Sequence, residues 1–179
     1  MRWVLVVLVA ALAGCGGGDD GASSRERSAP ARTPAEYPVA YSVAREELAG
    51  LAERPLPEAL EGAKVIASSS WDGYTLAVLS EWLYDQGIDL DRPRVPEAGR
   101  ISEAWDVPVI VITADHARRY GRRLERLRPS ETKLRAYFEA FSEGSHGTAG
   151  DGMEEYLDAV RAAMRAATGD RVVVLLMED

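Results

Sequence analysis

Two uninterrupted runs of apolar residues constrain the fold of this chain more than any other feature. Residues 107–113 (VPVIVIT) and 172–177 (VVVLLM) are rich in β-branched side chains and show no polar alternation. A strand buried on both faces has this composition, as in a parallel sheet that helices cover on both sides. A shorter run spans residues 63–68 (AKVIAS). We therefore expect at least three strands in one sheet.

Segments with the helical period separate these runs. Five amphipathic helices are expected to begin at or near Ser42, Asp72, Asp115, Ser130 and Met153. A fourth strand is expected either near residues 38–41 or in the proline-rich stretch 91–97. Strands that alternate with helices indicate an α/β fold. We predict a small, mostly parallel sheet of three or four strands, covered by about five helices.

The N-terminal segment has the features of an export signal in their usual order. Arg2 precedes an apolar stretch over residues 3–13, and small residues then lead to Cys15, the only cysteine. The apolar stretch is shorter than the roughly 20 residues that a membrane-spanning helix needs, so it is interpreted as a targeting segment. The run Leu12-Ala13-Gly14-Cys15 resembles the lipobox of bacterial lipoproteins.

The resemblance implies that residues 1–14 are removed as a signal peptide and that Cys15 is lipidated on its thiol. Acyl chains such as palmitate would then hold the protein in a membrane of the cell envelope. Gly16 stands where the family's sorting rule places aspartate for inner-membrane retention, so the outer membrane is favoured. The domain is then expected in the periplasm or at the cell surface. The alternative is an ordinary signal peptide with an incidental cysteine.

Residues 15–36 contain no large apolar side chain and are dominated by glycine, serine, alanine and proline. We interpret them as the lipidated N-terminus and a flexible linker, and about 20 such residues have a root-mean-square reach of roughly 25 Å. Residues 37–179 have the length of a single globular domain. The net charge of −8 argues against nucleic-acid binding and against electrostatic adhesion to anionic lipid.

Parallel strands would bring polar clusters together at the carboxyl-end edge of the sheet, where open α/β sheets bind ligands. The candidate ligand-binding residues are Ser69, Ser70, Trp71, Asp72, Asp115 and His116. Backbone amides at the helix start after Asp72 suit a small anion, although Asp72 would itself occupy them as an N-cap. A serine, His116 and an acid also permit a hydrolase, but the chain has no Gly-x-Ser-x-Gly motif. Because no pair of ligands has a typical metal-site spacing, no metal or cofactor is expected.

The helix expected after Asp115 carries an unusual density of basic residues. The candidate partner-binding residues are Arg118, Arg119, Arg122, Arg123 and Arg126. In an acidic chain this face suits an anionic partner, such as an acidic protein patch or a phosphorylated glycolipid. Alternatively, the arginines pair with acids elsewhere on the domain. His146 lies in the glycine-rich stretch 144–152, which is interpreted as a surface connection or as a lid over a site.

Together these patterns favour a membrane-anchored envelope lipoprotein whose domain binds a partner or serves as a scaffold. The alternatives are a tethered envelope hydrolase and a small-anion-binding module, each using the carboxyl-end edge of the sheet. Since no catalytic motif and no glycine-rich phosphate loop occurs, an enzyme is the less favoured class and no catalytic residue is assigned.

Overall fold

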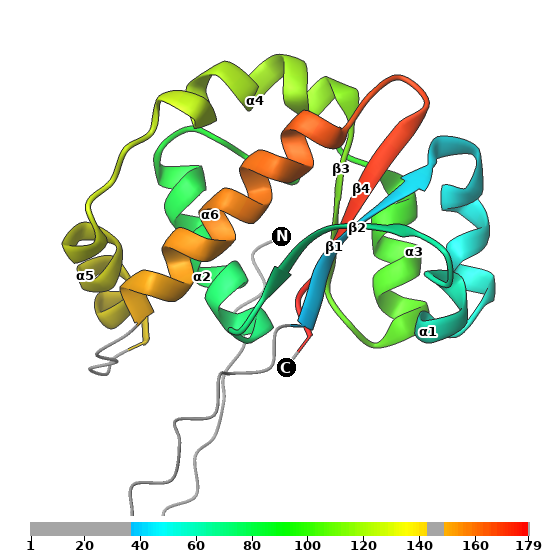
Figure 1. Cartoon of the computed structure of the whole chain (residues 1–179), viewed down its shortest axis with the longest axis horizontal. Helices are drawn as coiled ribbons and strands as arrows, with labels where there is room; N and C mark the ends of the chain where they lie inside the picture. Colours follow the sequence, from blue (N-terminus) through cyan, green and yellow to red (C-terminus); the bar gives the residue numbers. More distant parts are fainter. Residues whose placement is uncertain (1–36, 143–148, 179) are drawn as a thin grey trace, which may run out of the picture. The chain divides into compact units, whose positions relative to one another are not determined.

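The structure is a computed structural model that describes residues 37–142 and 149–178. Its four strands are β1 (Tyr37–Ala44), β2 (Lys64–Ser69), β3 (Val109–Ile112) and β4 (Arg171–Leu176). The seven helices of that part of the chain are the 3-10 helix η1 (Arg45–Glu53), α1 (Leu56–Ala59), α2 (Gly73–Asp85), α3 (Pro96–Trp105), α4 (Ala114–Arg126), α5 (Glu131–Ser142) and α6 (Ala149–Ala166). The strands form one sheet in the order β2-β1-β4-β3 (Figure 1).

Every neighbouring pair of strands in this sheet is antiparallel. The prediction of a mostly parallel sheet is therefore wrong, although the fold is α/β overall. A continuous apolar run records burial on both faces of a strand, and that burial does not depend on the direction of the neighbouring strands. Strand β1, at one of the two places expected for a fourth strand, lies between β2 and β4 and is antiparallel to both. Residues 91–97 contain no strand: residues 91–95 are turn and irregular chain, and Pro96 begins α3.

Helices cover the sheet on both faces, which explains the continuous apolar runs. Helices α2, α4, α5 and α6 pack on one face, and η1, α1 and α3 pack on the other (Figure 1). Consecutive residues of β4 alternate between the two cores: Leu175 packs with α2, α4, α5 and α6, whereas Val174 and Leu176 pack with η1 and α3. The sheet is thus the middle of three layers and separates two hydrophobic cores.

The helix starts agree with the sequence in part. Asp72 is the N-cap of α2, as predicted, because its Oδ1 accepts a hydrogen bond from the Thr75 amide at 3.1 Å. Ser42 instead lies within β1, and the residues that follow form the 3-10 helix η1. The N-cap of α4 is Thr113 rather than Asp115, since Thr113 and the third helical residue form a capping box.

The helices expected from Ser130 and around Met153 are confirmed as α5 and α6. Helix α3 was not predicted, because its proline-rich surroundings favour turns. Pro96 occupies its first turn, a position where the missing amide hydrogen of proline costs nothing. Proline there marks a helix start, and this is the signal that the sequence interpretation missed.

Candidate functional site

The residues that follow β2 are bound to α6 by hydrogen bonds. The Ser70 amide donates to Oε1 of Glu155 at 2.9 Å, and the Trp71 amide donates to Oγ of Ser69 at 3.1 Å. The Tyr156 hydroxyl donates to the Trp71 carbonyl oxygen at 2.8 Å. Burial raises the pKa of Tyr156 to about 12, so this hydroxyl keeps its proton. Ser69 is fully buried. The polar groups of this turn therefore connect β2 to α6.

The amides at the start of α2 also have partners within the protein. Oδ1 of Asp72 accepts hydrogen bonds from both the amide and the hydroxyl of Thr75. The Gly73 amide donates to the carbonyl oxygen of Glu178 at 2.8 Å. A Cβ atom on Gly73 would lie 2.2 Å from the carbonyl carbon of Met177, so the two backbone segments are in direct contact. An anion at this helix start would have to displace protein groups that already satisfy the amides.

Asp115 and His116 lie at the opposite edge of the sheet from residues 69–72. Strands β2 and β4 end at one edge, whereas β3 is antiparallel to β4 and ends at the other. The predicted convergence of the three polar clusters is therefore wrong, because it required parallel strands. A serine and a histidine that act together must lie within hydrogen-bond reach of each other. The sheet does not bring His116 to the serines after β2.

His116 is a buried structural residue with 0% of its surface exposed. Its Nδ1 accepts a hydrogen bond from the Thr113 amide at 3.2 Å, so Nδ1 carries no proton. Its Nε2 then donates to the Leu90 carbonyl oxygen at 3.1 Å. Burial lowers the pKa of His116, against the raising effects of the Leu90 carbonyl and of the carboxylates of Asp89 and Asp91. The imidazole is therefore neutral and joins α4 to the loop after α2.

The lowered pKa makes the free energy of unfolding depend on pH. The unfolded state takes up a proton near the ordinary histidine pKa of 6.5, while the folded state resists protonation to lower pH. Below about pH 6.5 the unfolded state thus binds more protons, and the folded state loses stability as the pH falls. His116→Gln keeps a capping-box side chain at this position and removes the titration. We expect wild type to lose stability relative to this variant between about pH 7.5 and pH 5 in urea titrations. A constant difference between the two proteins would contradict the buried neutral imidazole.

Three of the predicted partner-binding arginines of α4 have partners within the protein. Arg118 forms an ion pair with Asp115, one turn earlier. The Arg119 guanidinium lies 5.4 Å from the centroid of the Tyr120 ring, at a cation–π distance. Arg123 donates to a carbonyl oxygen just beyond α2 at 3.5 Å. The alternative, in which the arginines pair with acids elsewhere on the domain, is not what these three do: Arg118 pairs with an acid of its own helix, and the other two contact a ring and a carbonyl oxygen.

The other two arginines, Arg122 and Arg126, are exposed and form no hydrogen bond or ion pair with the described residues. Together with Arg118 they occupy every fourth position of α4, so the three guanidinium groups form one arginine stripe on the outer face of the helix. Like charges at this spacing destabilise a helix by about 0.2–0.5 kcal/mol per pair. In a chain of net charge −8, the arginine stripe is a basic surface that suits an anionic partner.

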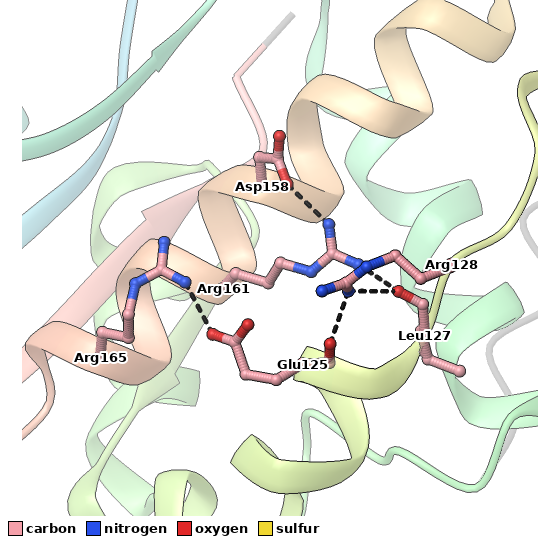
Figure 2. A network of polar contacts seen from close by, with 6 residues as sticks. All are labelled: Glu125, Leu127, Arg128, Asp158, Arg161 and Arg165. Atoms are coloured by element: carbon pink, nitrogen blue, oxygen red, sulfur yellow. Dashed lines mark hydrogen bonds and ion pairs between the residues drawn. The ribbon is translucent and has the colours of Figure 1, made fainter.

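Beyond the last turn of α4, an open groove of about 570 Å³ lies between α4, α6 and β2. Figure 2 shows the polar contacts on its wall. The guanidinium groups of Arg128 and Arg161 both donate to the carbonyl oxygen of Leu127, at 2.8 and 2.6 Å. Leu127 is the C-cap of α4, where the helix dipole favours positive charge. The two arginines therefore stabilise the end of this helix.

Carboxylates compensate the positive charge of this groove, which three arginines and three acidic residues line. Arg161 pairs with Asp158, and Arg165 pairs with Glu125, each at 2.7 Å (Figure 2). The sequence interpretation missed this network, because α6 lies more than 20 residues after the end of α4. The groove is close to neutral and internally paired, so it suits a charged ligand less well than the arginine stripe does.

Comparisons with known proteins identify no relative. No protein-family model, no curated protein and no solved structure matches the chain.

Cys15 and His146 lie outside the described residues, so the lipidation and the lid both stay predictions. Among residues 37–142 and 149–178, no three side chains of histidine, cysteine, aspartate or glutamate are grouped as a metal site requires. Within the same ranges, no helix combines the length and the apolar character needed to cross a bilayer.

Proposed function

We propose that this chain is a membrane-anchored lipoprotein of a bacterial envelope whose α/β domain binds an anionic partner through the arginine stripe. The observation that carries the proposal is that Arg122 and Arg126 are exposed and have no partner among the described residues. An acidic protein has many carboxylates with which to neutralise such a stripe, yet α4 keeps these two cations in solvent. Guanidinium groups form short, charge-assisted hydrogen bonds with carboxylates and phosphates.

Binding is favoured over hydrolysis by the contacts at the two edges of the sheet. The polar groups after β2 are engaged in bonds to α6 and to one another, and His116 is buried at the opposite edge. Small-anion binding at the start of α2 is disfavoured for a similar reason, since Asp72 and Glu178 already accept hydrogen bonds from its amides. On the described part of the domain, Arg122 and Arg126 of the arginine stripe stay open to a partner.

The anchor is supported by the leader, the lipobox-like run that ends in Cys15 and the linker composition that follows it. Metabolic labelling with palmitate in the producing bacterium tests it directly. Wild type is expected to incorporate label and Cys15→Ala to incorporate none, because Cys15 is the only thiol in the chain. Equal labelling of the two proteins would refute the anchor and leave the arginine stripe untouched.

Charge reversal on α4 tests the binding role. The double variant Arg122→Glu/Arg126→Glu is expected to reduce cross-linking to the partner in intact cells by at least about tenfold, or 1.4 kcal/mol. The interaction should also weaken with added salt, because exposed charges are screened over about 8 Å at physiological ionic strength and about 3 Å at 1 M. Both arginines lie on the solvent side of α4, so the fold is expected to be retained.

The matched control is Arg100→Glu, an exposed arginine on α3 at the other face of the sheet. This variant is expected to keep the cross-links of wild type. The proposal fails if the α4 double variant keeps them as well, or if reversal at Arg100 removes them equally.

A further inference from the structure

Five large apolar side chains are extensively exposed on the described part of the domain. Three of them lie at the end of the domain where β1 begins and β2 ends. The three residues of this aromatic cluster are Tyr37, Tyr74 and Phe141, with 66, 42 and 47% of their surfaces exposed. Scattered exposed apolar residues are common on soluble proteins, whereas grouped ones mark contact surfaces. The grouping of the three therefore requires an explanation.

The strand register and the ring contacts place the aromatic cluster at the end of the domain where β1 and α2 begin. Tyr37 pairs with Ser69, the last residue of β2, and α2 begins four residues later at Gly73. Tyr74 is in the first turn of α2, and its ring centroid lies 6.4 Å from that of Phe141 on α5. Side chains two positions apart on a strand point to the same face. Ser69 lies two positions after Ala67, which packs against the core with α2, and paired residues on neighbouring strands share a face, so Tyr37 faces the α2 side of the sheet.

The polypeptide enters the domain at this same end. Tyr37 is the first residue of β1, and about 20 residues connect it to Cys15, which corresponds to a root-mean-square reach of roughly 25 Å for the predicted linker. A tether of this length holds the entry end of the domain near the bilayer at a high effective concentration. Even if the domain binds the lipid surface weakly, a substantial fraction of the molecules is then in the bound state.

We infer that the aromatic cluster docks the domain onto the headgroup layer of the membrane in which Cys15 is anchored. This inference rests on the lipid anchor of the proposed function. Tyrosine suits the membrane–water interface, where its ring is buried and its hydroxyl stays hydrated, and the ring of Phe141 adds apolar surface that the interface can bury. The exposed carboxylates of Asp72 and Glu178 lie at the same end, so zwitterionic lipid is the favoured surface and anionic lipid is not.

Docking in this orientation determines which way the start of the arginine stripe faces relative to the bilayer. Helix α4 follows β3, which ends at the sheet edge opposite to the start of β1. With the aromatic cluster on the bilayer, the first turns of α4 face away from the lipid. Arg118 and Arg122 are then presented to a partner across the periplasm or outside the cell.

A fluorophore attached on α2 tests the docking. Acylation of Cys15 leaves no other thiol in the chain, so Tyr74→Cys and Tyr84→Cys in the full lipidated protein each create a single labelling site. Tyr84 is the matched control: it is the same residue type, it is 60% exposed, and it lies near the other end of the same helix. An environment-sensitive fluorophore is attached to the introduced cysteine. The labelled protein is then reconstituted into phosphatidylcholine vesicles whose headgroups carry a quencher.

An interfacial group lies about 5–10 Å deep, and position 84 is about 15 Å further along the helix. We therefore expect quenching at position 74 to be at least about twofold stronger than at position 84. Adding Tyr37→Ser and Phe141→Ser to the variant labelled at position 74 should reduce its quenching to the level of position 84. Circular dichroism checks that each variant is folded.

Three results would overturn the inference. If the protein floats with the vesicles and both positions are quenched equally, docking is wrong and the anchor stands. If neither labelled variant associates with the vesicles and wild type does not float with them, the anchor and the docking are both wrong. If the environment of the label at position 74 changes with the density of the protein on the vesicles while its quenching stays at the level of position 84, the aromatic cluster binds a second copy of the chain instead of lipid.

Discussion

Replacing Gly73 with alanine is expected to destabilise the protein by about 3 kcal/mol, the upper part of the usual range for inserting a methyl group into a packed interior. The new Cβ atom would lie 2.2–2.5 Å from backbone atoms of Met177. Backbone directly after a central strand cannot move aside as the end of a flexible side chain can. The shift would also strain the hydrogen bond from the Gly73 amide to the Glu178 carbonyl oxygen. Urea denaturation followed by circular dichroism measures the effect.

Gly99→Ala is the matched control for this substitution. Gly99 is exposed on α3, and a Cβ atom there would meet nothing within 4 Å. Alanine in a helix interior is favoured over glycine by roughly 0.5–1 kcal/mol, so this variant should be slightly more stable than wild type. Similar denaturation midpoints for the two alanine variants would show that α2 and the end of β4 are not in contact.

Leu175→Ala and Leu176→Ala are each expected to cost about 2–5 kcal/mol, as large-to-small substitutions in a well-packed core do. The two residues are consecutive on β4, so their side chains enter opposite faces of the sheet. Both are buried, with 0 and 2% of their surfaces exposed, and they belong to different cores. In a sheet with one face in solvent, only one of the two substitutions would be costly.

Val65→Ala serves as the reference for a strand residue outside both cores. Val65 lies on the edge strand β2 and is 44% exposed, so its truncation should change the free energy of unfolding by about 0.5 kcal/mol or less. A large cost at only one of the two leucines would contradict the three-layer arrangement.

The sequence was informative for several features that local residues determine, although the caps expected at Ser42 and Asp115 were wrong. The cap at Asp72 and the apolar face of α6 are set by residues within a few positions of each other, and both were predicted from them. Strand direction is different, because the apolar pattern of a strand records how deeply it is buried. The pattern does not say which neighbour it pairs with, and so the antiparallel pairing of β4 with β1 and β3 could not be read from it.

The same limit explains the outcome for the candidate site. The arginine stripe was found because Arg118, Arg122 and Arg126 lie on one helix, where the spacing alone aligns them. The contact of Arg161 with the Leu127 carbonyl oxygen joins residues on different elements, so no local sequence pattern predicts it. The expected meeting of His116 with the serines after β2 failed because it depended on parallel strand directions, which had to be assumed.

The position of β4 has a consequence for how the molecule is made. Strand β1 pairs with β4 across more than 120 positions of the chain, and β3 can pair only after β4 has been synthesised. Until residues 171–176 have been synthesised, the two halves of the sheet have no common strand, and contacts between such distant segments form slowly. A nascent chain that cannot close its sheet early stays extended for longer. For the export that we propose for this chain, such a delay would leave the polypeptide unfolded for longer, and an unfolded chain is the form that a narrow secretion channel admits.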